Sequence, residues 1–288
     1  MRIAIYGSRR QEEAAPTVAV FLDELRRRSV DIVMHRKLYR HLFEIIPQAL
    51  AAVGTVTDNS DFEADLAVSL GGDGTFLRTA MWVGQKEIPI VGVNTGHLGY
   101  LTSITVAELP RLLDYLASDH FRIERRGLIE LASPALEPHF CPYALNEVAI
   151  SKDESASMIW AEVMVDGVRL GAYRADGLLV CTSTGSTAYN LSAGGPIVQP
   201  TVNVHVISPV AAHSLAMRPL VVDGNAEIKI LPTGRTPRVR LALDGRSTEI
   251  DMGTEIRLVK APFSVLLLQP AAYTFADGLR EKLHWGAE

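Results

Sequence analysis

Hydrophobic positions in the first 120 residues follow two periods that alternate along the chain. Short continuous apolar runs predict buried strands over residues 2–6, 31–35, 64–70 and 88–94. Between them, apolar residues recur at helical spacing, which predicts helices over residues 16–25, 38–52, 75–83 and 106–117. Strict alternation of strand and helix predicts a parallel sheet with right-handed crossovers, and therefore an α/β domain.

The pattern changes over residues 121–270, where short apolar runs are separated by turns and helical spacing is hard to find. Asp-Gly between two apolar runs is typical of a β-hairpin. Such pairs predict hairpins at Asp166-Gly167, Asp223-Gly224 and Asp244-Gly245. We therefore expect an α/β domain over residues 1–120 and a β-rich, sandwich-like domain over 121–270. The tail, residues 271–288, is expected to form a helix and to complete the first domain.

Composition and charge narrow the function classes. The 288 residues are 48% hydrophobic and carry a formal net charge of −5. This excludes a disordered chain and disfavours a nucleic-acid partner, because nucleic-acid-binding proteins carry a basic excess. No apolar run approaches membrane-spanning length, so we expect no membrane partner. The first apolar run is too short for a signal peptide, and the chain has only two cysteines, so we expect a cytoplasmic protein.

The strongest candidate for chemistry is the run 71–75, GGDGT, at the point where a predicted strand ends and a helix begins. Glycines there let the backbone approach a phosphate, and the helix start supplies unpaired N–H groups and a positive dipole end. Thr75 can cap the helix, and Arg78, one turn later, either faces an anion at its start or is an ordinary solvated surface arginine. Asp73 would repel a phosphate unless a metal or a transferable proton lay between them. The alternative is a tight turn in which Asp and Gly only supply the required backbone angles.

A second polar loop, residues 94–101, follows the next strand on the same predicted sheet edge. Tyr100 could stack on a base there, although by residue type alone His97 and Tyr100 are more often packing residues. In the β-rich half, Asn146-Glu147 interrupts an apolar strand predicted over 143–150. A buried Glu is costly unless it is paired, and an Asn-Glu pair suits ribose hydroxyls or an adenine amino group.

A third polar segment begins at Arg174-Ala175-Asp176-Gly177 and continues into residues 182–195, which are rich in Ser, Thr and Gly. Its hydroxyl groups predict a donor-rich binding loop. The alternative is an elaborate hydrogen-bonded turn. Ser186 does not lie in a GxSxG sequence, so a nucleophilic serine is not supported.

Taken together, the run 71–75, the Asn146-Glu147 pair and the segment 182–195 resemble, in order and spacing, the NAD kinase family. These phosphotransferases transfer the γ-phosphoryl group of ATP, or of another phosphoryl donor, to the 2′-hydroxyl of the adenosine ribose of NAD. The resemblance implies a Rossmann-like N-terminal α/β domain and a C-terminal β-rich domain. It also implies NAD and ATP as substrates, Mg²⁺ or another divalent metal, and a homo-oligomer, either a dimer or a tetramer.

The resemblance carries roles onto particular residues. Asp73 matches the catalytic aspartate that accepts the 2′-hydroxyl proton, and Asn146 and Glu147 match the pair that holds the dinucleotide. Asp176 resembles the acid near the nicotinamide end. No residue is assigned as a metal ligand. The other positions expected to contact substrate are Gly71, Gly72, Gly74, Thr75, Arg78, Tyr100, Arg174, Thr184, Thr187, Ala188, Tyr189, Asn190, Leu191, Ser192 and Ala211.

Two other functions remain open at this point. Lipid kinases share the glycine loop, but recognition of an apolar acceptor does not explain the polar segment 182–195. A dinucleotide-sensing regulator on the same fold would bind NAD or NADP without phosphorylating it, and the intact Asp73 argues against that role.

Overall fold

The structure is a computed structural model that describes residues 1–8, 12–96, 99–118, 120–153 and 157–286. It divides into two compact units, one formed by Met1–Arg125 with Val265–Glu288 and the other by Arg126–Ser264. The chain passes from one unit to the other inside two long strands, β7 (Phe121–Ser133) and β18 (Ile256–Pro270). The divisions therefore lie within strands, after residues 125 and 264, a few residues from the predicted positions 120 and 270.

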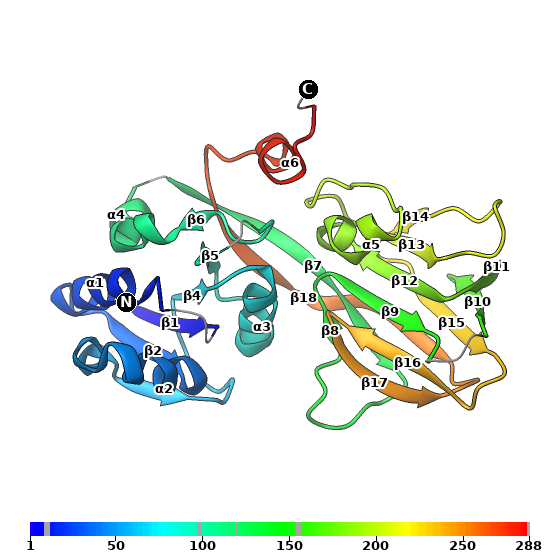
Figure 1. Ribbon diagram of the computed structural model, residues 1–288, viewed down its shortest axis with the longest axis horizontal. Coiled ribbons are helices and arrows are strands. Elements are labelled where there is room, and N and C mark those ends of the chain that lie inside the picture. Colours follow the sequence, from blue (N-terminus) through cyan, green and yellow to red (C-terminus); the bar gives the residue numbers. More distant parts are fainter. Residues whose placement is uncertain (9–11, 97–98, 119, 154–156, 287–288) are drawn as a thin grey trace. The chain divides into compact units, whose positions relative to one another are not determined.

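The first unit is built on a parallel sheet with the strand order β18, β5, β4, β1, β2, β3, and β6 pairs with β5 (Figure 1). Its other strands are β1 (Arg2–Gly7), β2 (Asp31–His35), β3 (Thr55–Thr57), β4 (Leu66–Leu70), β5 (Ile90–Asn94) and β6 (Ile104–Thr105). Leu267 of β18 pairs in parallel register with Ile90 of β5. The end of β18 therefore adds a strand to this sheet, and the tail after it forms the predicted helix.

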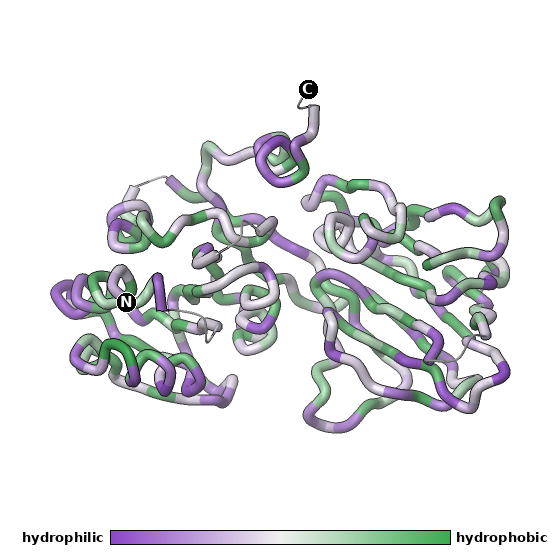
Figure 2. Tube along the Cα trace, in the orientation of Figure 1, coloured by the Kyte–Doolittle hydropathy of each residue, from purple (hydrophilic) through white to green (hydrophobic). Residues whose placement is uncertain are grey.

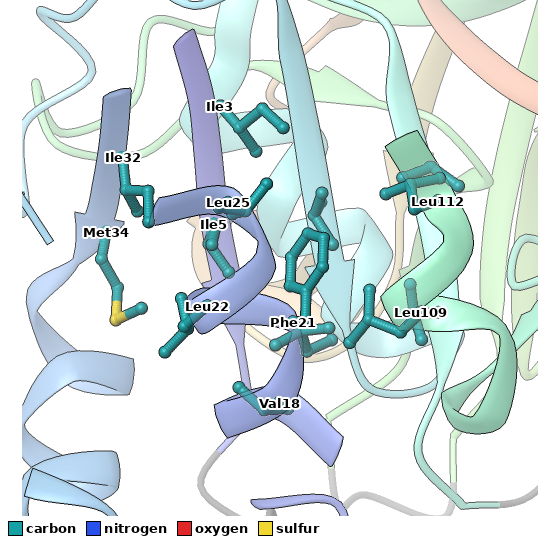
Figure 3. Close-up of a cluster of buried hydrophobic side chains, with 14 of the residues drawn as sticks. Ile3, Ile5, Val18, Phe21, Leu22, Leu25, Ile32, Met34, Leu109 and Leu112 are labelled. Carbon is teal, nitrogen blue, oxygen red and sulfur yellow. The ribbon is translucent and has the colours of Figure 1, made fainter. Parts of the chain in front are cut away.

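The helices of the first unit are α1 (Ala15–Arg27), α2 (Arg36–Ile45), α3 (Asp73–Val83), α4 (Leu112–Leu116) and α6 (Phe275–Leu283), with short 3₁₀ segments at Pro47–Ala52, Gly84–Lys86 and Val106–Arg111. The apolar stripe of α1 is fully buried, and Figure 3 shows Phe21 and Leu22 beside Ile5 of β1. Burial of each such side chain contributes about 1.5–3 kcal/mol. Figure 2 shows hydrophilic residues on the same outer helices, as expected of helices with one buried face.

One predicted helix is broken. Residues 106–117 form the 3₁₀ segment Val106–Arg111 followed by the short α4, rather than one α-helix. Pro110 lies inside the 3₁₀ segment, and proline has no N–H to continue an α-helical ladder. Thr105 and Glu108 form a capping box that starts the segment.

The second unit contains two antiparallel sheets, with the orders β14, β13, β12, β9, β16, β17 and β11, β10, β15, β18. Its strands include β8 (Tyr143–Ala144), β9 (Glu147–Ser151), β10 (Ile159–Val165), β11 (Val168–Ala175), β12 (Gly177–Thr182), β13 (Val204–Val210), β14 (Leu220–Asp223), β15 (Ile228–Thr233), β16 (Arg238–Leu243) and β17 (Arg246–Asp251). The two sheets bury one shared core, represented by Ile150, Val163 and Ile230. The predicted fold class, an α/β domain followed by a β-rich, sandwich-like domain, is confirmed.

Two of the three predicted hairpins form. Asp166-Gly167 joins β10 to β11, and Asp244-Gly245 joins β16 to β17. Both aspartates and both glycines have positive φ, as a two-residue type I′ turn requires. The third prediction, Asp223-Gly224, is wrong, because β14 pairs with β13 whereas β15 pairs with β10 and β18. There the Asp223 carboxylate accepts the N–H of Asn225 (2.7 Å) in a local turn that leads from one sheet to the other.

Within the described residues, no helix is both long enough and apolar enough to cross a membrane.

Candidate functional site

The GGDGT run forms a tight passage from β4 into α3 in the first unit. Gly71 has φ +151, and a Cβ placed on it would lie 2.4 Å from Thr75 Oγ1, so a side chain there would clash. The helix begins at Asp73 with Gly72 as its N-cap. The predicted cap at Thr75 is therefore wrong: Thr75 lies in the first turn, where its backbone N–H donates to Gly72 O. The acid is thus at the positive end of the helix dipole.

The Asp73 carboxylate is held by the loop that follows β5. Tyr100 N–H donates to Oδ2 (2.6 Å) and Leu101 N–H donates to Oδ1 (2.9 Å). A Cβ on Gly99 would lie 2.0 Å from Asp73 Oδ1, so only glycine permits this approach. A carboxylate has about four acceptor sites, so each oxygen can still accept a proton or a further hydrogen bond. His97, which belongs to the same loop in sequence, lies outside the described residues.

Arg78 extends back toward the start of α3. It is exposed, and its Nη2 donates to Thr75 Oγ1 (3.2 Å). Its Nη1 lies 4.0 Å from a Cβ placed on Gly74. A guanidinium at this end of a helix is disfavoured by the dipole, unless an anion lies there as well. The run 71–75 and Arg78 together form a local setting suited to a phosphate.

In the second unit, the Asn146-Glu147 pair lies where a bend meets a strand: Asn146 is in the bend after β8, and Glu147 is the first residue of β9. The strand predicted over 143–150 is divided into β8 and β9, because the backbone between them bonds to the carboxylate of Asp244. Asp244 accepts the N–H groups of Leu145 (2.7 Å), Asn146 (2.8 Å) and Glu147 (3.2 Å). Burial raises the pKa of Asp244, and these three N–H groups act against that shift. Asp244 thereby fixes the backbone that presents both predicted binding residues.

The Glu147 side chain is half-buried beside the segment 182–195, and its Oε2 atom is fully buried. The backbone N–H of Tyr189 donates to its carboxylate, whereas Oε2 has no hydrogen-bond partner among the described residues. Burial, and then the charge of Asp244, raise the pKa of Glu147 to about 7. Cys181 lies opposite it in the sheet register, and burial raises the pKa of this thiol to about 12. An unpaired buried acceptor of this kind is available to a ligand hydroxyl or amino group.

Glu147 predicts a pH dependence of stability. A pKa raised from 4.5 to about 7 means that the fold favours the protonated acid. The stability it contributes is fully present below pH 4.5 and is lost as the pH rises through about 7. We expect Glu147→Gln to unfold at nearly the wild-type temperature at about pH 5, and to be the more stable protein at about pH 8. Thermal unfolding over this range, with the exposed Glu255→Gln as control, measures the difference; a pH-independent difference would contradict it.

A cavity of about 440 Å³ opens beside Glu147, and several of the predicted site residues line it. Asp176, Tyr189 and Gly245 line it together with Lys152, whose Nζ forms an ion pair with Asp176 Oδ1 (2.8 Å). Arg174 is not among the lining residues: it is exposed, with its guanidinium 5.4 Å from the ring centroid of Trp160. The structure therefore brings Glu147, Asp176 and Tyr189 to one cavity and leaves Arg174 elsewhere on the unit.

Much of the segment 182–195 bonds to its own backbone. Asn190 is fully buried; its amide donates to Ser186 O and Pro196 O (both 3.1 Å) and accepts from Ser208 Oγ (2.6 Å). Its donors are thus used in holding the loop. Thr184 is also buried, and Thr187, Ala188 and Leu191 are half-buried, whereas Tyr189 and Ser192 are exposed. The turn alternative therefore describes part of this segment, and Tyr189 and Ser192 are the predicted binding residues in it that are exposed.

Two contacts join this segment to the bend formed by Leu145 and Asn146. Thr182 N–H donates to Asn146 O (2.9 Å), and Thr182 Oγ1 donates to Leu145 O (2.6 Å). A Cβ on Gly185 would lie 2.1 Å from Asn146 O, which explains a glycine among the hydroxyl residues. Ala211 is exposed in a left-handed conformation (φ +50), directly after the Val210 carbonyl that accepts the N–H of Asp176 (3.0 Å). A positive φ at a residue other than glycine is strained and often marks a functional position.

Three residues of these sites have no individual signal in the sequence. The sequence identifies Asp244 only as a hairpin residue and Gly99 only as one glycine of a loop. No sequence feature points to Lys152. Each acts on a residue that is distant along the chain, so neither spacing nor periodicity could reveal it.

Comparison with known proteins assigns the family. The model of the ATP-NAD kinase N-terminal domain matches residues 3–121, and that of the ATP-NAD kinase C-terminal domain matches residues 145–269. The chain is 36% identical to the NAD kinase of Bacteroides fragilis over 288 residues, covering 100% of this chain and 99% of that protein. It is 39% identical to the NAD kinase of Porphyromonas gingivalis over 291 residues, covering 99% and 98%.

Solved structures agree on the fold. A yeast NADH kinase complexed with NADH superposes with a TM-score of 0.88 at 23% identity, covering 100% of this chain and 89% of that one. An NAD kinase from Archaeoglobus fulgidus in complex with ATP gives a TM-score of 0.73 at 26% identity, covering 94% of each chain. With both halves matched by the paired domain models and relatives aligned from end to end, this chain belongs to the ATP-NAD kinase family.

Proposed function

We propose that this protein transfers the γ-phosphoryl group of ATP to the 2′-hydroxyl of the adenosine ribose of NAD, giving NADP and ADP. The observation that carries the proposal is the Asp73 carboxylate, fixed by two backbone N–H groups at the start of α3. The chain that contains it aligns over its whole length with proteins named NAD kinase. The bound NADH and bound ATP of the two structural relatives support the same pair of substrates.

Phosphoryl transfer needs positioning, charge neutralisation and an acceptor for one proton. The ribose 2′-oxygen forms a bond to the γ-phosphorus while the bond from that phosphorus to the β,γ-bridging oxygen breaks, and ADP leaves. The 2′-hydroxyl proton passes to Asp73. A carboxylate is too weak a base to ionise this hydroxyl beforehand, so Asp73 orients it and accepts the proton late in a loose transition state.

The binding roles divide between the two units. In the first, Gly72 and Gly74 would bring backbone N–H groups to a phosphate, with Arg78 beside them. Gly71 and Thr75 would shape the turn, because their N–H groups already donate to Val93 O (3.0 Å) and Gly72 O (2.8 Å). In the second, Asn146, Glu147 and Asp176 would bind hydroxyl and amide groups of the dinucleotide. The exposed Tyr189 offers a ring for stacking, and its neighbours Thr184, Thr187, Ala188, Asn190, Leu191 and Ser192 shape or line the same region. Tyr100, Arg174 and Ala211 complete the proposed set.

A divalent metal, Mg²⁺ or a similar ion, would neutralise the phosphate charge when it is bound. In the described part of the chain, no group of three or more His, Cys, Asp or Glu side chains is placed to hold an ion. Mg²⁺ is commonly bound through substrate phosphates, water and one or two carboxylates.

We further propose a cytoplasmic homo-oligomer, a dimer or a tetramer. The second unit exposes large apolar side chains on neighbouring strands: Trp160 (50%), Leu170 (41%) and Leu231 (37%). Exposed apolar groups gathered in this way are typical of an association surface. Light scattering coupled to gel filtration tests the proposal, and a monomer at the concentration used in the activity assay would contradict it.

One experiment separates the candidate functions. The purified protein is incubated with NAD, ATP and Mg²⁺, and NADP is measured with an NADP-specific dehydrogenase, with diacylglycerol supplied as a competing acceptor in a parallel reaction. We expect NADP that depends on ATP. Phosphorylated lipid without NADP would indicate a lipid kinase, and NAD binding without any product would indicate a regulator.

A further inference from the structure

The C-terminal helix α6 reaches the loop that holds Asp73. Gly278 and Lys282 are four residues apart and therefore lie on one face of this helix. The Lys282 ammonium lies 4.8 Å from the ring centroid of Tyr100 and 5.3 Å from that of Tyr273. Tyr100 is the residue whose backbone N–H donates to Asp73 Oδ2. One cation from the tail thus contacts the ring of a residue that orients the proposed catalytic acid.

Close packing fixes this arrangement. Gly278 is buried, and a Cβ placed on it would lie 3.3 Å from Tyr273 Oη and 3.9 Å from Tyr100 Cε1. The hydroxyls of Tyr100 and Tyr273 are buried and have no hydrogen-bond partner among the described residues. The two rings and the ammonium, rather than hydrogen bonds from the hydroxyls, therefore hold the cluster together.

The tail is anchored just before α6 by Arg122 at the start of β7. Arg122 Nη1 donates to Pro270 O (3.1 Å) and Ala271 O (2.8 Å), and Nη2 donates to Tyr273 O (2.7 Å). Thr274 and Asp277 then form a capping box that starts the helix. A charged side chain bound to three carbonyl groups sets where α6 begins, and so sets where Lys282 lies.

We propose that α6 is a positioning element for catalysis: through Lys282 and Gly278, and with Tyr273 just before its start, it holds Tyr100, whose backbone orients the Asp73 carboxylate. The inference rests on the proposed role of Asp73. Tyr273 and Lys282 touch no reacting atom and act only through Tyr100. Loss of this support should let the loop 99–101 move and the carboxylate rotate, which lowers turnover while substrate binding is retained.

Two variants test the proposal, each by two measurements. In Lys282→Met the cation is removed and the stem is kept; we expect kcat to fall about tenfold, with the KM for NAD and for ATP within twofold of wild type. Gly278→Val crowds both rings, and we expect kcat to fall about 10²-fold. Replacing the lysine by another cation, in Lys282→Arg, should preserve most of the wild-type turnover.

Lys86→Met is the matched control. It removes another cation–ring pair of the same unit, in which the Lys86 ammonium lies 3.8 Å from the centroid of the Phe62 ring, and it should leave kcat unchanged.

Hydrogen exchange gives the second measurement and does not depend on activity. Peptides that contain residues 99–103 should lose protection in Lys282→Met and Gly278→Val but keep it in Lys86→Met, while peptides from β1 and β4 stay unchanged. The proposal is overturned if residues 99–103 exchange as slowly in both variants as they do in the wild type. A loss of protection with normal kcat would overturn it as well. An inactive wild type would instead refute the proposed function, and the exchange data would still decide whether α6 holds the loop.

Discussion

Asp73→Asn should lose NADP formation by about 10²–10⁴-fold in kcat, the usual contribution of a positioned general base. The amide keeps the size of the carboxylate but cannot accept the 2′-hydroxyl proton. Its Nδ2 would also face a backbone N–H of Tyr100 or Leu101, so about 1–3 kcal/mol of stability is expected to be lost. NAD affinity should stay within a few-fold, because the dinucleotide-binding residues proposed in the second unit are untouched.

Turnover by coupled assay, NAD binding by calorimetry and thermal unfolding together check this result. Glu63→Gln, an exposed acid of the same unit, provides the control for a change of one charge. Near wild-type NADP formation by Asp73→Asn would refute the catalytic role. Equal losses of NAD affinity and kcat would move Asp73 to a binding role.

Asp244→Asn is expected to impair NAD binding more than any substitution of an exposed residue. The carboxylate accepts hydrogen bonds from three backbone N–H groups. Asparagine keeps only one acceptor oxygen, and its NH₂ group would face Leu145 N–H or the N–H groups of the next two residues. Each buried N–H left without a partner costs about 1–3 kcal/mol, which is enough for a rise of about tenfold or more in the KM for NAD. Because kcat depends on Asp73 in the other unit, it should change much less.

The variant also predicts a change in pH dependence. The charge of Asp244 is one of the causes that raise the pKa of Glu147 to about 7. Removing that charge should move the pH at which Glu147 ionises, and with it the pH dependence of NAD affinity, to lower values. Asp166→Asn is a matched control: it also precedes glycine in a type I′ turn, but its exposed carboxylate bonds only Glu227 N–H (2.9 Å) among the backbone N–H groups of the described residues. Equal effects of the two substitutions would show that the turn, not the buried carboxylate, is what matters.

The fold class was predictable because it follows from local periodicity. Val18, Phe21, Leu22 and Leu25 mark one helix face, and each is fully buried in α1. In the two hairpins that form, Asp and Gly both have positive φ, and these residue types are common in turns that require it. The failures are local signals overruled by their surroundings. Asp223-Gly224 has the same chemistry, but its two strands find better partners in different sheets.

The candidate site was predictable only where a motif carries its own chemistry. GGDGT identifies Asp73 and its position at a strand–helix junction, and Asn146-Glu147 stands out as polar within an apolar stretch. For Arg174 and Asn190, the residue type is a poorer guide to the contacts that the side chain makes. Arg174 lies outside the cavity that contains Asp176, and the amide of Asn190 bonds within its own loop. A residue type states which bonds a side chain can make, whereas its neighbours decide which bonds remain for a ligand.

The order of residues along the chain is enough to predict the two-part architecture, the family resemblance and the acid at the start of α3. How that acid and the Asn146-Glu147 pair are held depends on contacts between distant parts of the chain. Asp73 is oriented by N–H groups 27 and 28 residues away, and Asn146 by a carboxylate 98 residues away. Lys282 reaches Tyr100 from the far end of the chain. Local spacing specifies helices and strands because their hydrogen bonds are short in sequence, whereas the orientation of a side chain depends on groups that folding alone brings together.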